Sequence, residues 1–197
     1  MLYNCVMFTA IILSAGKSQR FGSPKALATI NNTTAIEFIQ HKLLNSIIDE
    51  VIIVLGHRPE VISPYVMKHA KVKVVTNNVY LSGQLSTIQC GLSSCHKDST
   101  AALIWPVDCP LISADTLLRL ISVHQQNGLS CIIPSYQGVK GHPPLIPASL
   151  YKKISNSLSD IGLNAILKQH EAMTIEINDP GIIKSFNTPK EFQDLNN

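Results

Sequence analysis

Two glycines, two lysines and an arginine follow an apolar run near the start of the chain, in the segment 11–25, IILSAGKSQRFGSPK. A glycine such as Gly16 lets the backbone approach a ligand closely, and the N–H groups of such a turn form a concavity that binds anions. Arg20 and Lys25 add positive charge that can neutralise several phosphate oxygens. We therefore interpret this segment as a phosphate-binding loop whose charge suits a nucleoside triphosphate better than a monoanion.

The loop differs from the two best-known phosphate-binding sequences. Gly16 and Gly22 do not form G-x-G-x-x-G, and the chain contains no G-x-x-x-x-G-K-[ST]. The sequence thus gives no support to a dehydrogenase or a P-loop ATPase, and NAD(P) binding would be needed to revive the first. The alternative to a phosphate site is a surface loop that contains glycine and basic residues without a ligand.

An aspartate ends a second apolar run, in LIWPVDCP at residues 103–110. If the sheet is parallel, Asp108 lies at the same sheet edge as the basic loop, where ligands gather. Mg²⁺ takes oxygen ligands, keeps several waters and often needs one or two protein carboxylates besides the substrate phosphates. Asp108 is therefore a candidate magnesium ligand, and the alternative is a turn or capping aspartate before Pro110.

A third segment, YQGVKGHPPLIP at residues 136–147, combines a lysine and a histidine with turn residues. Gly138 and Gly141 flank Lys140, and two prolines after His142 stiffen the loop. A rigid loop of this kind can hold an anionic acceptor, although it can also be an ordinary turn. His57, in LGHRPE, allows the same two interpretations, of which we favour the ordinary turn, and the seven histidines show no zinc-ligand spacing.

Length and composition indicate one compact domain over residues 1–197. A net charge of +3, with 15% charged residues, is too small to predict a nucleic-acid or membrane surface. Five cysteines without a CxxC pair fit a reducing cytosol. We interpret the apolar start as a buried first strand instead of a targeting signal, and no segment has the length of a membrane span, so we expect a cytoplasmic protein.

Short β-branched runs alternate with longer amphipathic segments along the chain. Such apolar strands, separated by helical crossovers, predict an α/β fold: a Rossmann-like, doubly wound, mostly parallel sheet with helices on both faces. Strands are expected over residues 8–13, 50–56, 72–76, 100–107, 129–136 and 172–179. Helices are expected over residues 33–44, 60–70, 85–95, 113–128 and 161–170, the second of them interrupted by a proline.

The loop L-S-A-G-K-S-Q-R-F-G-S-P-K resembles the signature of MobA-like nucleotidyltransferases, L-x-[AG]-G-x-S-x-R-[MF]-G-x-x-K. The resemblance extends over nearly the whole chain, through VIIVLGH, NNVYLSGQLSTIQCGL, WPVDCP, GHPPLIP and INDPGIIKSFNTPKEF. Within that family the sequence is most similar to the molybdenum cofactor cytidylyltransferases. These enzymes join CMP to molybdopterin and have a Rossmann-like α/β fold.

The resemblance implies a role for each residue that matches a family motif. The loop residues would contact the nucleotide, with Arg20 and Lys25 on its triphosphate. Gly83 and Thr87 would lie near the base and ribose. The nucleotide set is Leu13, Ser14, Ala15, Gly16, Arg20, Lys25, Gly83 and Thr87; the acceptor set is Gly141 and His142; and the magnesium ligands are Asp108 and Asn187.

The chain departs from the cytidylyl pattern at its end. That group closes with D-I-D-T-P, whereas this chain has Ser185 to Pro189 as S-F-N-T-P, so the second metal ligand would be the neutral Asn187. An N-T-P ending also resembles the guanylyl branch. Against that branch, two glycines are usual where this chain has Ala15 and Gly16. We weigh the loop above the tail because the loop touches the base.

The resemblance implies transfer of CMP from CTP to the phosphate of molybdopterin, with Mg²⁺ as cofactor and pyrophosphate as product. Arg20, Lys25 and Asp108 would be the catalytic residues, and a molybdoenzyme is a possible recipient of the product. Three alternatives stay open. They are a guanylyltransferase, a nucleotidyltransferase for a sugar phosphate or alcohol phosphate, and a non-catalytic carrier of the cofactor.

Overall fold

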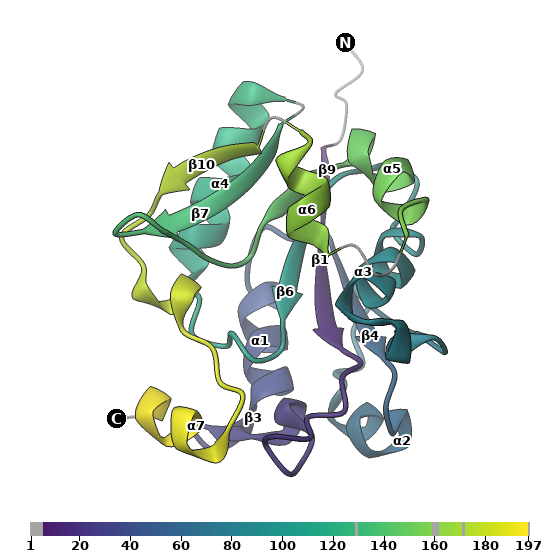
Figure 1. Cartoon of the computed structure of the whole chain (residues 1–197), viewed down its shortest axis with the longest axis vertical. Coiled ribbons are helices and arrows are strands. Elements are labelled where there is room, and N and C mark those ends of the chain that lie inside the picture. Colours follow the sequence, from purple (N-terminus) through teal and green to yellow (C-terminus); the bar gives the residue numbers. More distant parts are fainter. Residues whose placement is uncertain (1–5, 129, 159–161, 171, 197) are drawn as a thin grey trace.

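The computed structural model describes residues 6–128, 130–158, 162–170 and 172–196. Within these residues one eight-stranded sheet forms the centre of the molecule (Figure 1). Its first strand is buried along almost its whole length because both faces are covered. The strands of this sheet are β1 (Met7–Ser14), β4 (Glu50–Leu55), β5 (Val72–Thr76), β6 (Ser99–Pro106), β7 (Cys131–Tyr136), β8 (Val139–Lys140), β9 (Leu145–Pro147) and β10 (Ala172–Glu176).

The strand order is β10-β7-β9-β6-β1-β4-β5, with β8 paired to β7. β1 pairs in parallel with β4 and β6, and β4–β5 and β10–β7 are parallel as well. β9 is antiparallel to both β6 and β7. The predicted α/β class with a mostly parallel sheet is confirmed. The carboxyl ends of β1 and β6 therefore meet at one sheet edge, as the position of the candidate site requires.

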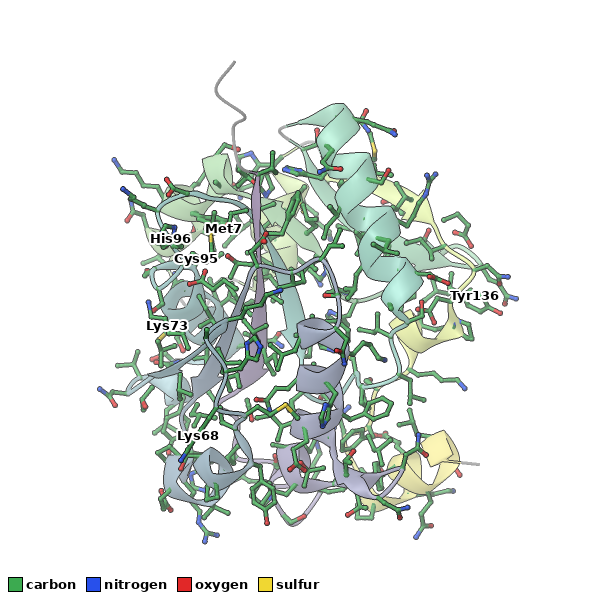
Figure 2. The ribbon with its side chains drawn as sticks, turned by 180° about the vertical axis from the view of Figure 1, so that it is seen from behind. Met7, Lys68, Lys73, Cys95, His96 and Tyr136 are labelled. Carbon is green, nitrogen blue, oxygen red and sulfur yellow. The ribbon has the colours of Figure 1, made fainter. Side chains whose placement is uncertain are left out.

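Helices pack on both faces of the sheet, and the alternation of side chains along β1 shows it. Phe8, Ala10 and Ile12 belong to the cluster that α1 and α4 cover, and Ile11 and Leu13 to the cluster that α3, α5 and α6 cover. Figure 1 shows the second group in front, and Figure 2, from behind, shows the first. The helices are α1 (Ala35–Leu44), α2 (Pro59–Ile62), α3 (Gln84–Leu92), α4 (Ala114–Asn127), α5 (Tyr151–Ser155), α6 (Leu163–Lys168) and α7 (Pro189–Asn196).

Local signals set the helix ends where capping residues are present. The Thr34 hydroxyl accepts from the N–H of Glu37, whose carboxylate in turn accepts from the N–H of Thr34, so α1 begins with a capping box. Ser113 caps α4 in the same position, and Gly128 ends it with a φ of 71°. Both helices lie within the predicted ranges.

The helix expected over residues 60–70 is only partly formed. α2 ends at Ile62, a single 3-10 turn follows at Ser63–Tyr65, and residues 66–71 are not helical. Pro64 has no N–H to continue the helix, which explains the early end. The helix expected over 161–170 is shorter, at Leu163–Lys168, with residue 161 outside the described residues.

No helix in the described part of the chain combines the length and the apolar composition that crossing a bilayer requires. Four cysteines, Cys90, Cys95, Cys109 and Cys131, are free thiols. Cys5, the fifth, lies outside the described residues.

Candidate active site

The basic loop leaves β1 at Ser14 and reaches Lys25 through a turn centred on Ser18. Ser18 has a φ of 52°, and its carbonyl accepts from the N–H groups of Phe21 and Gly22. Its hydroxyl accepts from the N–H of Lys25 at 3.1 Å. The turn therefore places Lys25 beside the end of β1. The glycine and lysine pattern predicted a loop, whereas the left-handed serine at its centre was not predicted.

A cavity of about 300 Å³ opens at this edge of the sheet. Most of its lining comes from the loop after β1, the start of α3 and the end of β6, and Ile62 of α2 completes it. The sequence-predicted residues among its lining are Leu13, Ser14, Ala15, Gly16, Lys25, Gly83, Thr87 and Asp108. The fold thus gathers eight predicted residues around one space, and Tyr80 and Gln84 are further lining residues that the sequence did not single out.

Glycines and a short side chain shape the wall of this cavity. A Cβ built on Gly16 meets no atom within 4 Å, so the backbone there faces open space. Gly56 has the opposite environment, because a Cβ on it would lie 2.7 Å from the Cβ of Ala15. The N–H of His57 donates to the Ala15 carbonyl at 3.0 Å, and its ring contacts the Tyr80 hydroxyl at 3.2 Å. The β4–α2 loop therefore holds the start of the basic loop in place.

The start of α3 forms the opposite wall. Gly83 has φ 102° and ψ 177°, a conformation that is essentially limited to glycine, and α3 begins at the next residue. The first N–H groups of a helix have no partners within it and attract anions. Thr87 is buried, and its hydroxyl accepts from the side-chain amide of Asn77 at 3.2 Å. Gly83 and Thr87 thus both line the cavity.

Three distant segments meet in one charged cluster at the mouth of the cavity. The Lys25 ammonium lies 2.5 Å from the Asp108 carboxylate and donates to the Asn187 side-chain oxygen at 3.1 Å. The Arg20 guanidinium donates to the same Asn187 oxygen at 3.2 Å. Arg20 does not line the cavity itself, but it shares the Asn187 oxygen with Lys25, which does. The backbone N–H of Phe186 donates to the Asp108 carbonyl at 3.2 Å and fixes the two segments together.

The oxygen atoms in this cluster are of the kind that a divalent cation needs. One carboxylate oxygen of Asp108 and the amide oxygen of Asn187 both face a single cation, the Lys25 ammonium. Two such oxygens suit Mg²⁺, which keeps several waters and needs few protein ligands. Among the described residues no group of three His, Cys, Asp or Glu side chains could hold a metal. The residues present therefore fit a metal ion that takes two ligands from the protein and the others from water and bound phosphate groups.

Cys109, next to the aspartate, belongs to the core. It is buried, and burial together with the neighbouring Asp108 raises the pKa of its thiol. Its carbonyl accepts from the Trp105 indole N–H at 2.9 Å. A neutral, buried thiol is a poor nucleophile and a poor metal ligand, so we assign Cys109 to packing.

An aromatic cluster positions Asn187. Phe186 is fully buried, with ring centroids 5.2 Å from Phe21 of the basic loop and 4.8 Å from Phe192 of α7. The Glu191 carboxylate accepts from the N–H of Asn187. The end of the chain is thus packed against the basic loop, a contact that nothing in the local sequence predicted.

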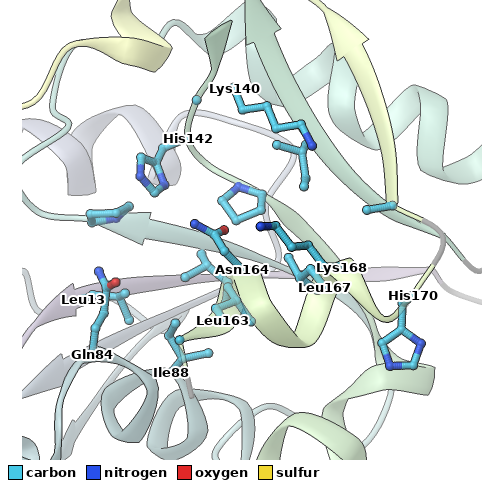
Figure 3. Close-up of a pocket in the computed structure, with 17 residues that line it drawn as sticks. Leu13, Gln84, Ile88, Lys140, His142, Leu163, Asn164, Leu167, Lys168 and His170 are labelled. Carbon is cyan, nitrogen blue, oxygen red and sulfur yellow. The ribbon is translucent and has the colours of Figure 1, made fainter. Parts of the chain in front are cut away.

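A second cavity, of about 580 Å³, adjoins the first (Figure 3). The two share Leu13, Gln84 and Pro106 in their lining. Apolar side chains such as Ile88 and Leu167 form much of its wall. Its polar lining residues are Lys140, His142, Asn164, Lys168 and His170, together with the end of the shared Gln84. Both predicted acceptor residues line this cavity, whereas Asn164 and Lys168 come from the short α6 and were not predicted.

The loop at Gly141 and His142 is held tightly. The N–H of Gly141 donates to the Pro134 carbonyl at 2.8 Å, and that of His142 to the Ile182 carbonyl at 2.8 Å. A Cβ on Gly141 would lie 2.5 Å from the Ile182 oxygen, so only glycine fits without movement. Burial lowers the pKa of His142, and its Nδ1 has no partner among the described residues. The lowered pKa favours the neutral imidazole, and His142 lines this cavity.

Gly16→Ala separates ligand contact from folding. The added methyl group meets no protein atom, so the thermal midpoint of unfolding should stay within about 2 °C of wild type. The methyl enters the space where a nucleotide would approach the backbone, and we expect the KM for the nucleotide to rise about tenfold to a hundredfold. Gly162→Ala, also without contacts within 4 Å, is the comparison variant: Gly162 lines the second cavity and not the cavity beside Gly16, so the KM for the nucleotide should stay unchanged. An unchanged KM in Gly16→Ala would place the nucleotide elsewhere.

A model of the MobA-like NTP transferase domain matches residues 10–173 of the chain. Bifunctional protein GlmU of Acholeplasma laidlawii is 29% identical over 144 residues, which are 70% of this chain. The chain covers only 30% of the length of that relative.

Solved structures share the fold along nearly the whole chain. Rv0371c from Mycobacterium tuberculosis H37Rv matches with a TM-score of 0.81 and 20% identity, covering 97% of this chain and 98% of that one. Rv0371c has also been crystallised with manganese. The 4-diphosphocytidyl-2C-methyl-D-erythritol synthase from Anaerococcus prevotii matches at 0.76 and 14%, covering 97% and 95% of the two chains. Molybdopterin-guanine dinucleotide biosynthesis protein A from Archaeoglobus fulgidus matches at 0.75 and 13%, covering 94% and 95%. At identities this low, the TM-scores establish the shared fold alone.

Proposed function

Because the chain belongs to the MobA-like NTP transferase family, we propose that it transfers CMP from CTP to the phosphate of molybdopterin and releases pyrophosphate. The observation that carries this proposal is the pair of adjoining cavities. One is bordered by the cations Lys25 and Arg20, the other contains Lys140 and Lys168, and they share Leu13 in their walls. Two substrates could therefore meet at the end of β1.

The reaction needs no general base. An oxygen of the acceptor phosphate attacks the α-phosphorus of CTP, and the bond from that phosphorus to the bridging β-phosphate oxygen breaks. Pyrophosphate leaves with the bonding electrons, and no proton has to move because the attacking oxygen is already anionic. Lys25 and Arg20 stabilise the charge that develops on the phosphates, and the loop backbone orients them.

Asp108 and Asn187 are the residues that would hold a divalent cation, which we propose is Mg²⁺. When bound, the cation neutralises charge on the phosphates. Asn187 supplies a neutral oxygen and therefore a weaker ligand than a second carboxylate. The packing of the buried Phe186 offsets part of this weakness, because it holds the Asn187 oxygen in a fixed place.

The second cavity suits an acceptor that is both apolar and anionic. Its apolar wall fits a flat ring system such as a pterin, and neutral His142 and Asn164 can hydrogen-bond to ring substituents. Figure 3 shows Lys140 and Lys168 extending across the same cavity. The described lining contains no carboxylate to pair with these lysines, so their charge is available to the acceptor. A structural relative named for molybdopterin-guanine dinucleotide biosynthesis supports this choice of acceptor.

GTP is the main competitor for the nucleotide, because the N-T-P sequence resembles the guanylyl branch and its Asn187 contacts Lys25 and Arg20. We favour CTP because Ala15 lines the nucleotide cavity where the guanylyl branch usually has glycine. A structural relative whose name contains a diphosphocytidyl product supports CTP as well. A non-catalytic carrier would not need the Arg20, Lys25 and Asp108 cluster.

Mass spectrometry of the product tests the proposal. Incubation with CTP, Mg²⁺ and molybdenum-loaded molybdopterin should give a species heavier than the acceptor by one CMP residue. A CMP adduct formed only with a sugar phosphate or alcohol phosphate would assign a different acceptor. Binding of molybdopterin without any adduct from CTP or GTP would favour the carrier.

Lys168→Met tests the acceptor side separately. We expect the KM for the acceptor to rise about tenfold to a hundredfold, because one charged contact is lost, while the KM for CTP stays unchanged. Lys152→Met is the control, since Lys152 is an exposed lysine on α5 that does not line either cavity. An equal rise in both KM values, or none, would remove Lys168 from the acceptor site.

A further inference from the structure

The geometry points to a second role for Lys25: in the ligand-free protein its ammonium group occupies the place of the divalent cation. We infer that the cation enters together with the nucleotide and binds weakly before it. This inference rests on the proposed function in one respect, the presence of a triphosphate substrate. It does not depend on which base or which acceptor the enzyme uses.

The first argument is the position of the ligand atoms. The Lys25 Nζ lies 2.5 Å from Oδ2 of Asp108 and 3.1 Å from Oδ1 of Asn187, so both oxygens are directed at one point. The other carboxylate oxygen of Asp108 lies on the side of the buried Cys109 thiol, 3.9 Å from its Sγ. A metal bound to Asp108 and Asn187 would therefore use the oxygens that Lys25 now contacts. Two cations cannot share that point.

The second argument concerns the fate of the displaced lysine. The side chains of Lys25 and Asp108 are only 16% and 20% exposed, so their attraction is weakly screened by water. Separating such a pair leaves an uncompensated charge unless another partner replaces it. Among the described residues that line this cavity, Asp108 is the one carboxylate. The protein thus offers Lys25 no second anion there, whereas a triphosphate does.

A coupling between metal and nucleotide follows from these two points. The nucleotide draws Lys25 onto its phosphates and frees Asp108 and Asn187 for the cation. By linkage, each ligand must then raise the affinity for the other by the same factor. Lys25 therefore determines the order in which nucleotide and cation bind, and it also contacts the phosphates during the reaction. Removal of its charge should make the metal site available without nucleotide.

Manganese binding to the free full-length protein tests the inference, with free Mn²⁺ measured by electron paramagnetic resonance in the absence of nucleotide and acceptor. We expect Lys25→Met to bind Mn²⁺ about 5- to 150-fold more tightly than wild type. Lys17→Met removes the same charge from an exposed position of the same loop and should resemble wild type. A non-hydrolysable CTP analogue should raise the Mn²⁺ affinity of wild type strongly and that of Lys25→Met much less.

Two controls keep the result interpretable. Asp108→Asn combined with Lys25→Met should abolish the tight binding, and tight binding that persists would overturn the inference because Mn²⁺ would then lie elsewhere. Lys25→Gln replaces Lys25→Met if the latter has a lowered thermal midpoint. Equal or weaker Mn²⁺ binding in folded Lys25 variants would also overturn it. Because no turnover is measured, a failure to transfer CMP would refute the proposed function without affecting this result.

Discussion

Asp108→Asn is expected to lower turnover about a thousandfold at saturating CTP and Mg²⁺. Asparagine keeps the size of the side chain but loses the negative charge that holds a divalent cation. Asn187 would then be the remaining protein ligand at the cluster, and two neutral oxygens bind Mg²⁺ poorly. Initial rates of pyrophosphate release at increasing Mg²⁺ concentrations measure the effect.

The control for this variant is Asp115→Asn, which removes a charge from an exposed position in the first turn of α4. It should have wild-type activity. Thermal unfolding of both variants shows whether loss of activity reflects loss of structure. Activity of Asp108→Asn within a few-fold of wild type, at ordinary Mg²⁺ concentrations, would mean that the metal is held by other residues.

Lys25→Met is expected to lower turnover by about two to three orders of magnitude, the usual effect of removing one transition-state charge contact. The reason differs from that for Asp108, because the metal ligands remain and we expect their affinity for the cation to rise. We therefore expect no rescue of Lys25→Met by high Mg²⁺. The KM for CTP should change less than kcat, since the pyrophosphate carries more negative charge in the transition state than in bound CTP.

Lys17→Met is again the matched control and should retain wild-type rates. The two lysines lie on one loop and differ in burial: Lys17 is exposed, whereas Lys25 is largely buried against Asp108. Steady-state kinetics of both variants with CTP and molybdopterin make the comparison. A Lys25→Met enzyme within a few-fold of wild type would exclude Lys25 from the mechanism.

The parallel centre of the sheet could be predicted from sequence because its strands are apolar on both faces. β1, β4 and β6 have this pattern, and the helices between them provide the crossovers. The antiparallel β9 could not be predicted in the same way. Its three residues, Leu145–Pro147, are buried like a parallel strand, and burial alone does not reveal strand direction. Its direction follows from the turn at Gln137 and Gly138, after which β8 and then β9 run antiparallel to β7.

The nucleotide side of the candidate site was largely predictable because its residues lie in one contiguous loop and at two strand or helix ends. The acceptor side was less so. Lys168 and Asn164 lie on a helix of six residues without a motif, and only the folding of α6 over the sheet brings them beside His142. The packing of Phe186 against Phe21 is a contact between the two ends of the chain, and local sequence patterns do not report such contacts.

Pyrophosphate release from CTP, GTP, ATP and UTP, each with Mg²⁺ and with or without molybdenum-loaded molybdopterin, tests the central claim most directly. We predict release only when CTP and the cofactor are both present. Release with GTP and the cofactor instead would show that Asn187 and the N-T-P sequence determine the nucleotide. If none of the four nucleotides gives pyrophosphate in the presence of molybdopterin, the proposed function is contradicted.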